Sequence, residues 1–245
     1  MNKSLILAHR GASAYAPENT TIAFTKAIEM GADGFELDIH LSKDGNLIVI
    51  HDESVNRTTN GSGFIKDLTL GEIKKLDAGS WFDSQFSDEK VPTLDEVLTL
   101  IKDTQLLINI EIKNGPFFYA EIEQKIIDCV VRHSMIDRVI VSSFDHYSIV
   151  KIKKLNSSIK TGALFLARTI NSWKYIKEIG ADAIHPHFVS VTSEVVKNCH
   201  ENNIEIHTYT ANEPEHIKHL ARLGVNSIIT NFPDIAKEIV NSLKK

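Results

Sequence analysis

The sequence contains little cysteine, no long apolar segment and no excess of positive charge. Cys129 and Cys199 are its only cysteines. They are too few for a disulfide framework, so buried thiols in a reducing compartment are expected. The apolar run at 5–8 is shorter than the roughly 7–15 residues of a signal-peptide core, and no window approaches the roughly 18 apolar residues of a spanning helix. The net charge of −5 disfavours a nucleic-acid binder held by bulk positive charge. We therefore expect a cytoplasmic protein with no nucleic-acid partner and no stable membrane insertion; the sequence leaves its oligomeric state open.

Short β-branched runs alternate with amphipathic helical patterns along almost the whole chain. The expected strands are 5–8, 34–39, 106–112, 138–143, 160–165, 182–185, 204–209 and 227–230. The expected helices include 20–30, 94–102, 119–130 and 234–243. This alternation predicts a parallel sheet, and the lack of G-x-G-x-x-G after the first strand favours a barrel over a doubly wound sheet. The predicted fold is an α/β (β/α)8 TIM barrel, with residues 1–245 as a single domain.

One segment interrupts the alternation after the second strand. It begins with a hairpin, because two apolar arms flank the turn former Lys43-Asp44-Gly45-Asn46. The part at about 53–92 is rich in turn formers, contains one expected short helix at 70–76, and is interpreted as a small insertion on the catalytic rim. Its aromatic residues Trp81, Phe82 and Phe86 either form an exposed apolar rim or pack the insertion onto the barrel, and packing is favoured.

Strand alternation brings three carboxylates to one face of the predicted sheet. In 34–39, Glu36 and Asp38 share a face opposite the apolar residues, and in the next barrel strand Glu111 faces the same way. Buried carboxylates need a cation or protons. Three oxygen-only ligands suit one hard divalent cation, Mg²⁺ or Ca²⁺. The alternative is an ordinary ion pair, for instance between Glu111 and Lys113.

Two histidines end strands beside these carboxylates. His9 ends the first strand, and His51 ends the returning hairpin arm. If Ser42 faces Leu47 across the turn, Asp38 lies opposite His51. Two histidines that flank a cation site form a reasonable general acid/base pair. Arg10 and Lys113 supply positive charge for an anionic oxygen, with surface solvation as the alternative.

Together these segments resemble the glycerophosphodiester phosphodiesterase family along the whole chain. The resemblance is carried by HRGASAYAPENT, ELDIHLSKDG, IVIHD, IEIK and the closing GVNSIITNFP. It implies hydrolysis of small glycerophosphodiesters, such as glycerophosphocholine or glycerophosphoethanolamine, to glycerol 3-phosphate and an alcohol. It makes His9 and His51 the catalytic pair. The implied metal ligands are Glu36, Asp38 and Glu111, and the implied phosphate contacts are Arg10 and Lys113. Glu18 and Asn19 match the PENT element, which is expected to brace the first loop, while Thr20 is expected to start the helix.

Two residues depart from the family pattern: Asn231 stands where an Asp is usual, and Tyr209 where a Trp is common. Neither is expected to touch the seven residues assigned above. The candidate pocket-lining residues are Glu18, His185, His187, His207 and Tyr209. Three alternatives stay open: a preference for lysophospholipid or phosphatidylinositol-type substrates, a glycoside hydrolase with a carboxylate-rich barrel mouth, and a non-catalytic binder of glycerophosphodiesters.

Overall fold

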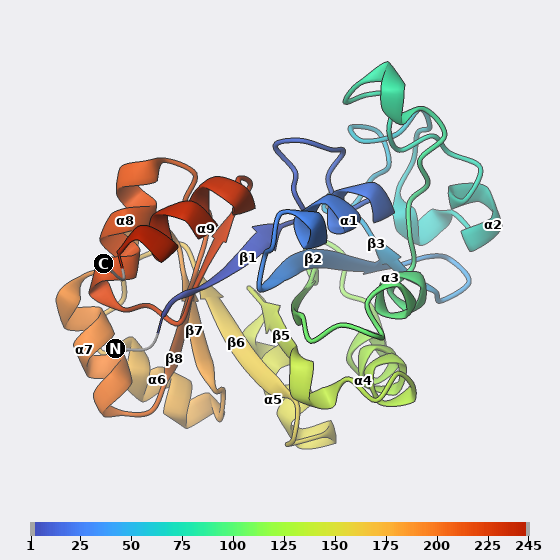
Figure 1. Cartoon of the computed structure of the whole chain (residues 1–245). Helices are drawn as coiled ribbons and strands as arrows, with labels where there is room; N and C mark the ends of the chain where they lie inside the picture. Colours follow the sequence, from blue (N-terminus) through green and yellow to red (C-terminus); the bar gives the residue numbers. More distant parts are fainter. Residues whose placement is uncertain (1–2, 244–245) are drawn as a thin grey trace.

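A closed barrel of eight parallel strands forms the centre of the molecule, seen in a computed structural model that describes residues 3–243 (Figure 1). The strands are β1 (Leu5–His9), β2 (Gly34–Leu41), β3 (Leu47–Val49), β4 (Leu107–Ile112), β5 (Val139–Ser143), β6 (Lys160–Phe165), β7 (Ala183–Pro186), β8 (Glu205–Thr208) and β9 (Ser227–Thr230). Strand β1 pairs with both β2 and β9, which closes the barrel, and β3 is an additional antiparallel arm on β2. The predicted (β/α)8 barrel is confirmed.

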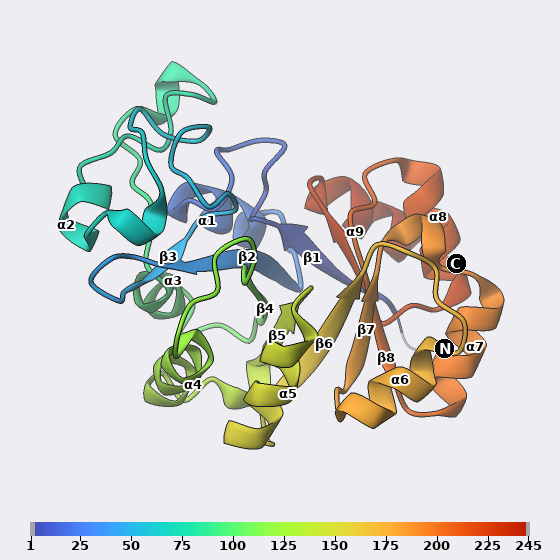
Figure 2. The ribbon, with the colours of Figure 1, turned by 180° about the vertical axis from the view of Figure 1, so that it is seen from behind.

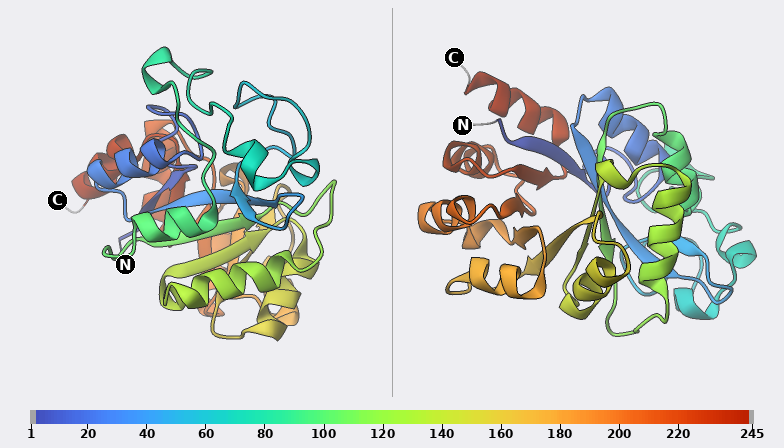
Figure 3. Two further views of the ribbon diagram at one scale, coloured as in Figure 1. Left: turned by 90° about the vertical axis from the view of Figure 1, so that its right-hand side faces the viewer. Right: turned by 90° about the horizontal axis from the view of Figure 1, so that it is seen from below.

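Helices surround the barrel and cover the outer face of its strands (Figure 3). They are α1 (Thr21–Glu29), α3 (Leu94–Leu100), α4 (Ile122–Arg132), α5 (His146–Leu155), α6 (Ser172–Ile179), α7 (Ser193–Glu201), α8 (Pro214–Leu223) and α9 (Pro233–Ser242). The short helix α2 (Leu70–Ile73) lies in the segment between β3 and α3. In the described part of the chain, four short 3₁₀ helices lie between them: η1 (Ile65–Asp67), η2 (Ser84–Phe86), η3 (Ile136–Arg138) and η4 (Phe188–Ser190). Within residues 3–243, none of these helices is long and apolar enough to cross a membrane.

Helix boundaries follow local capping, which explains where the predicted helices were too long. Thr20 caps α1 as expected, because its side chain accepts from the Ala23 backbone N–H. The helix expected at 70–76 ends at Ile73, since the N–H groups of Lys75 and Leu76 bond three residues back and tighten the last turn. The helix expected from 119 begins at Ile122, because Glu121 before it has a left-handed backbone with φ 65°.

The strands separate an apolar outer layer from a more polar interior. Side chains such as Phe35, Leu37 and Ile110 are fully buried in the cluster between the strands and the helices. The alternate side chains of the same strands point inward, and Asn109 and Ser142 are among the buried polar residues there. The polar inward residues of β2 and β4 continue to the carboxyl ends of the strands, where they form the candidate site.

The hairpin of β2 and β3 has a register that differs by one residue from the predicted one. Leu41 faces Leu47, and the Ile50 N–H donates to the Asp38 carbonyl, so Asp38 lies opposite Ile50 and not His51. The turn is tightened by Ser42, whose Oγ accepts from the Asn46 N–H. The prediction that Asp38 and His51 are directly paired was therefore wrong, although His51 still follows the returning arm onto the same end of the barrel.

The segment between β3 and α3 rises above one side of the barrel, at the upper right of Figure 1. It has its own apolar cluster, to which Val55, Ile65 and Ile73 contribute. Phe86 is buried against Ala16 of the first βα connection and Ala23 of α1, with Phe82 packed beside it. Trp81 remains 39% exposed. The favoured interpretation, that these aromatic residues pack the insertion onto the barrel, is confirmed for Phe82 and Phe86.

Candidate active site

Three buried carboxylates meet at the carboxyl ends of β2 and β4. Glu36 and Asp38 lie on β2, and parallel pairing places Asp38 beside Glu111 on β4. One oxygen from each lies within 4.8 Å of one from each of the others. Burial, followed by the neighbouring carboxylates, raises the pKa of Glu36 well above its usual range. Burial also raises the pKa of Glu111. The raised pKa values of Glu36 and Glu111 show that additional positive charge would be needed to keep all three carboxylates ionised.

Arg10 and Lys113 lie directly on this carboxylate cluster. The Arg10 Nε is 3.4 Å from Asp38 Oδ2, and the Lys113 Nζ is 3.0 Å from Asp38 Oδ1 and 2.5 Å from Glu111 Oε1. Although burial opposes it, Lys113 and Arg10 hold the pKa of Asp38 far below its usual range. Glu36 Oε2 accepts from the Arg10 backbone N–H at 3.1 Å, whereas Glu36 Oε1 has no partner among the described residues.

The cluster fits a divalent cation in both charge and chemistry. Its three carboxylates and two cationic side chains leave one net negative charge, and their oxygens are the ligands that Mg²⁺ and Ca²⁺ prefer. An unpartnered, buried carboxylate oxygen on Glu36 is costly unless a cation or a proton meets it. With a divalent cation bound, the same set would carry one net positive charge, which matches a singly charged phosphodiester.

His9 lies at the end of β1, with one ring nitrogen facing Glu36 and the other bonded to Asn231. Its Nδ1 is 2.7 Å from the Oδ1 of Asn231, which follows β9, and its Nε2 is 4.0 Å from Glu36 Oε2. With Nδ1 donating to Asn231, Nε2 carries the free lone pair and faces the carboxylates. Burial, followed by the charge of Arg10, lowers the pKa of His9 to about 4. The ring is thus held neutral near pH 7. The expectation that Asn231 does not touch the assigned residues was wrong.

His51 is held by a chain of charged side chains that leads back to the first loop. Its Nδ1 is 2.7 Å from Asp52 Oδ1, and both oxygens of Asp52 accept from Arg57. The guanidinium of Arg57 also donates to both oxygens of Glu18, at 2.9 and 2.8 Å. Glu18 in turn accepts from Arg10 at 2.9 Å. Glu18 therefore links Arg10 to the side chains that orient His51.

Three residues of the first loop have left-handed backbones: Arg10, with φ 56°, Gly11 and Asn19. Gly11 has φ 80°, and a Cβ there would lie 2.6 Å from the Ala23 carbonyl carbon, so only glycine fits. Asn19 has φ 58°; its backbone N–H donates to the Arg10 carbonyl, and its Nδ2 donates to Asp38 Oδ2 at 2.8 Å. The PENT element thus braces the loop as expected, and Asn19 also orients a carboxylate of the cluster.

A cavity of about 210 Å³ opens beside the cluster. Among its lining residues are His51, Glu111, Lys113 and Phe144. Tyr209 lies beside this cavity, because its ring centroid is 6.1 Å from that of Phe144. Burial, followed by the charge of Glu111, raises the pKa of Tyr209 above its usual range. His187 lies next to Tyr209, with ring centroids 5.8 Å apart. Glu18 lines a small recess with His51. Three of the five candidate pocket-lining residues therefore lie at this end of the barrel.

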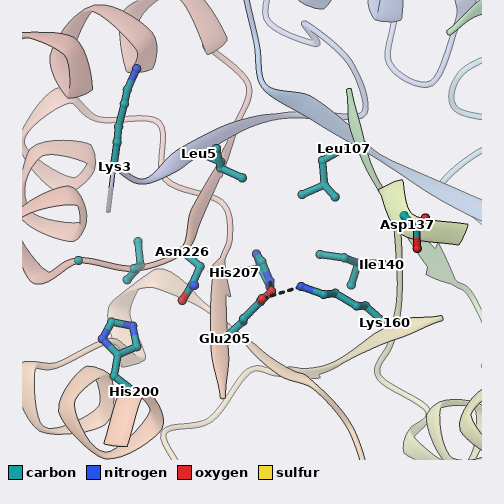
Figure 4. Close-up of a pocket in the computed structure, with 12 residues that line it drawn as sticks. Lys3, Leu5, Leu107, Asp137, Ile140, Lys160, His200, Glu205, His207 and Asn226 are labelled. Atoms are coloured by element: carbon teal, nitrogen blue, oxygen red, sulfur yellow. Dashed lines mark hydrogen bonds and ion pairs between the residues drawn. The ribbon is translucent and has the colours of Figure 1, made fainter. Parts of the chain in front are cut away.

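The structure does not bring His185 and His207 to the carboxylate cluster. His185 is fully buried inside the barrel. His207 lines a cavity of about 580 Å³ with Leu5, Leu107 and other residues at the starts of the strands, which is the opposite end of the barrel (Figure 4). There its Nε2 bonds to Glu205, which also pairs with Lys160. His185 therefore belongs to the barrel interior, and His207 to the cavity at the amino-terminal end of the strands.

Several contacts at the site involve residues that the sequence reasoning did not assign. These residues are His40, Asp52, Arg57 and Tyr119. His40 is buried, and its ring bonds to the His51 carbonyl and to the Tyr119 hydroxyl, both at 3.0 Å. The only signal for Asp52 was its place next to His51. Arg57 lies in a segment without regular structure, where no periodicity indicates the direction of a side chain.

The chain is similar to known phosphodiesterases over nearly its full length. Residues 9–235 match the model of the glycerophosphoryl diester phosphodiesterase family. The sequence is 44% identical to a glycerophosphodiester phosphodiesterase of Caldanaerobacter subterraneus, with 99% of each chain covered. It is 42% identical to one of Bacillus altitudinis, with 98% of this chain and 99% of the other covered.

Solved structures of phosphodiesterases are also similar to this chain over nearly its full length. A glycerophosphodiester phosphodiesterase of Thermotoga maritima has a TM-score of 0.80 and 29% identity, with 98% of this chain and 99% of that chain covered. A phosphodiesterase of Oleispira antarctica, solved in complex with the product sn-glycerol-3-phosphate, has a TM-score of 0.90 and 26% identity, with 98% and 97% covered.

Proposed function

Because the chain belongs to the glycerophosphoryl diester phosphodiesterase family, we propose that it hydrolyses small glycerophosphodiesters, such as glycerophosphocholine, to glycerol 3-phosphate and an alcohol with one bound Mg²⁺ or Ca²⁺. The family makes the protein a phosphoric diester hydrolase, and neither a glycoside hydrolase nor a non-catalytic binder. The observation that carries the proposal is the cluster of Glu36, Asp38 and Glu111 beside two oriented histidines.

The carboxylates Glu36, Asp38 and Glu111 would hold the cation. When bound, it would neutralise the negative charge that grows on the phosphate oxygens in the transition state. Arg10 and Lys113 already lie beside the cluster, and their side chains are 17% and 15% exposed. Each would contact the phosphate with the N–H groups that the carboxylates leave free. Their present carboxylate contacts are compatible with this role, since a guanidinium and an ammonium each have several donors.

The two histidines would divide acid and base work according to their partners. His9 is held neutral, with Nε2 free, and would remove the proton of the attacking hydroxyl or water. His51 is oriented by the 2.7 Å contact of its Nδ1 with Asp52, and would give a proton from Nε2 to the departing alcohol. Hydrolysis then adds the elements of water across the phosphorus–oxygen bond to the leaving group.

The test is the release of sn-glycerol 3-phosphate from glycerophosphocholine by the purified protein. We expect none with a chelator and turnover after addition of Mg²⁺ or Ca²⁺. His9→Ala and His51→Ala should each lower kcat by about 10²–10⁴-fold while circular dichroism stays unchanged. Turnover that persists in chelator would refute the metal requirement. Full activity in either histidine variant would remove that residue from the mechanism.

A further inference from the structure

A second group of metal-binding side chains lies on the outer wall of the barrel, where α3 meets α4. Cys129 belongs to the last turn of α4, His133 caps the end of that helix, and Asp95 lies in the first turn of α3. The two helices lie side by side in opposite views of the molecule (Figure 1 and Figure 2). One sulfur, one imidazole nitrogen and one carboxylate oxygen of these residues lie within 4.8 Å of one another. The cavity beside the carboxylate cluster is lined by other residues, so this group is separate from the candidate active site.

The spacing of Cys129 and His133 directs both side chains to the same partner. Residues four apart on a helix lie on one face, one turn from each other, and zinc-binding helices use this spacing for two ligands. Asp95 completes the group from the neighbouring helix, with its Oδ1 3.0 Å from His133 Nε2. Ligand atoms about 2.0–2.3 Å from a tetrahedral metal are about 3.3–3.8 Å apart. Small side-chain shifts would therefore bring the three atoms around one ion.

The group already holds a cationic side chain. The Nη2 of Arg132 lies 2.6 Å from Asp95 Oδ1 and 3.6 Å from Cys129 Sγ. The atoms that attract this guanidinium are thus the ones that would ligate a metal ion. The Arg132 side chain is 61% exposed, and Asp128 lies one turn earlier on the same helix. Because an exposed ion pair contributes little to stability, the guanidinium can turn to solvent when a metal ion binds.

The donor atoms select the kind of metal. A thiolate and an imidazole favour Zn²⁺ over Mg²⁺ or Ca²⁺, which prefer oxygen ligands alone. Burial raises the pKa of the Cys129 thiol to about 11, so the bound metal must supply the charge that stabilises the thiolate. The thiolate and the Asp95 carboxylate together balance the two charges of Zn²⁺. Cys129 is only 3% exposed, whereas the Asp95 side chain is 53% exposed, so solvent reaches the group from the oxygen side.

We propose that Cys129, His133 and Asp95 bind one Zn²⁺, with a water molecule as the fourth ligand, and that this ion joins α3 to α4. On binding, the thiol loses its proton to solvent and a sulfur–zinc bond replaces the sulfur–hydrogen bond. Helices α3 and α4 precede and follow β4, the strand that carries Glu111. The ion therefore stabilises the part of the barrel that holds one carboxylate of the cluster. This site does not depend on the proposed function.

The probe is Co²⁺, which takes the place of Zn²⁺ and absorbs in the near ultraviolet when a thiolate ligates it. Carboxylates give no such band, so the signal separates this site from the cluster of Glu36, Asp38 and Glu111. We expect a titration of the reduced protein with Co²⁺ to produce the band and added Zn²⁺ to abolish it. Zn²⁺ should also raise the melting temperature of the wild type more than that of variants that lack a ligand.

Single substitutions assign the ligands. Cys129→Ser should abolish the band, whereas Cys199→Ser, which replaces the buried cysteine of α7, should leave it unchanged. His133→Gln and Asp95→Asn keep the sulfur and should each weaken Co²⁺ binding by at least about tenfold. Arg132→Gln removes the competing cation and should strengthen Co²⁺ binding by about two- to fivefold.

Absence of the band in the wild type would overturn the zinc site, and so would a band that Cys129→Ser keeps. Unchanged Co²⁺ affinity in both His133→Gln and Asp95→Asn would overturn it as well, because the thiol would then bind the metal alone. These two variants decide the question even if Cys129→Ser does not fold, since the side chains of His133 and Asp95 both reach solvent.

Discussion

The imidazole of His9 is oriented by the side chain of Asn231, whose Oδ1 lies 2.7 Å from Nδ1. The two residues are 222 positions apart and meet only because β9 closes the barrel against β1. Burial, followed by the charge of Arg10, lowers the pKa of His9, and the hydrogen bond to Asn231 opposes this only in part. The amide is neutral, so it supports the protonated ring less than a carboxylate would, and Asn231 stands where the family pattern usually has Asp.

Asn231→Asp should move the acidic limb of the pH profile upward. A carboxylate next to Nδ1 favours the imidazolium, so the pKa of His9 should rise by about one unit or more. Since the proposed base must be neutral, kcat/KM should fall near pH 5 and change little near pH 8. Asn212→Asp is the control, because Asn212 accepts from the Asn231 backbone N–H and has no bond to His9. An unchanged limb in Asn231→Asp would contradict this account of the contact.

Arg57→Gln should lower kcat by roughly 10- to 100-fold, less than the loss of His51 itself. The change removes the fork that holds Asp52 and Glu18 together, so His51 and Arg10 would both sample wrong orientations. Arg57→Lys keeps the charge but not the planar fork and should recover only part of the rate. Steady-state kinetics at saturating cation would measure this. Equal activity in the wild type and Arg57→Gln would show that the chain of ion pairs has no positioning role.

Local periodicity explains which parts of the site could be predicted from the sequence. Side chains alternate along a strand, so Glu36 and Asp38 necessarily share a face, and parallel pairing with β4 brings Glu111 to them. The hairpin register was wrong by one residue, because turn residues alone do not decide which residue of the returning arm pairs with Ser42. The pairing that forms is Leu41 with Leu47.

Contacts between side chains of distant segments could not be predicted in the same way. Arg57 reaches Asp52 and Glu18 from a stretch with no repeating geometry, so its direction depends on how the insertion folds. His207 was assigned to the strand ends near the mouth, yet it lies near the lower cavity. In that case the sequence identified an inward-facing residue but not its depth inside the barrel.

Glu111→Gln should weaken cation binding by at least about tenfold. The amide keeps the shape of the side chain but removes one of three negative charges from the cluster. Because burial raises the pKa of Glu111 and of Glu36, protons compete with the cation, so its apparent affinity should rise with pH and binding should release protons. Titration calorimetry in two buffers would measure both effects. Glu178→Gln, at an exposed position of α6, should leave them unchanged, and equal affinity in Glu111→Gln would exclude Glu111 as a ligand.

His185→Leu should remove part of the loss of stability in acid. His185 is fully buried, and neither ring nitrogen has a partner among the described residues. Burial, followed by the neighbouring His207, lowers its pKa well below 6.5. Below about pH 6.5 the unfolded chain therefore takes up a proton that the folded chain refuses, and the free energy of unfolding falls by up to about 1.4 kcal/mol per pH unit. Leucine carries no titrating group.

Urea denaturation at about pH 7.5, 6.5 and 5.5 would test this difference. The stability of His185→Leu relative to the wild type should increase as the pH falls through this window. His219→Leu replaces an exposed histidine on α8, whose proton uptake in the folded and unfolded states should be similar, so its difference from the wild type should stay constant. If the difference in unfolding free energy between His185→Leu and the wild type also stayed constant with pH, the buried ring would take up a proton as readily in the folded protein as in the unfolded chain. The barrel interior would then solvate the charged ring better than its lack of partners implies.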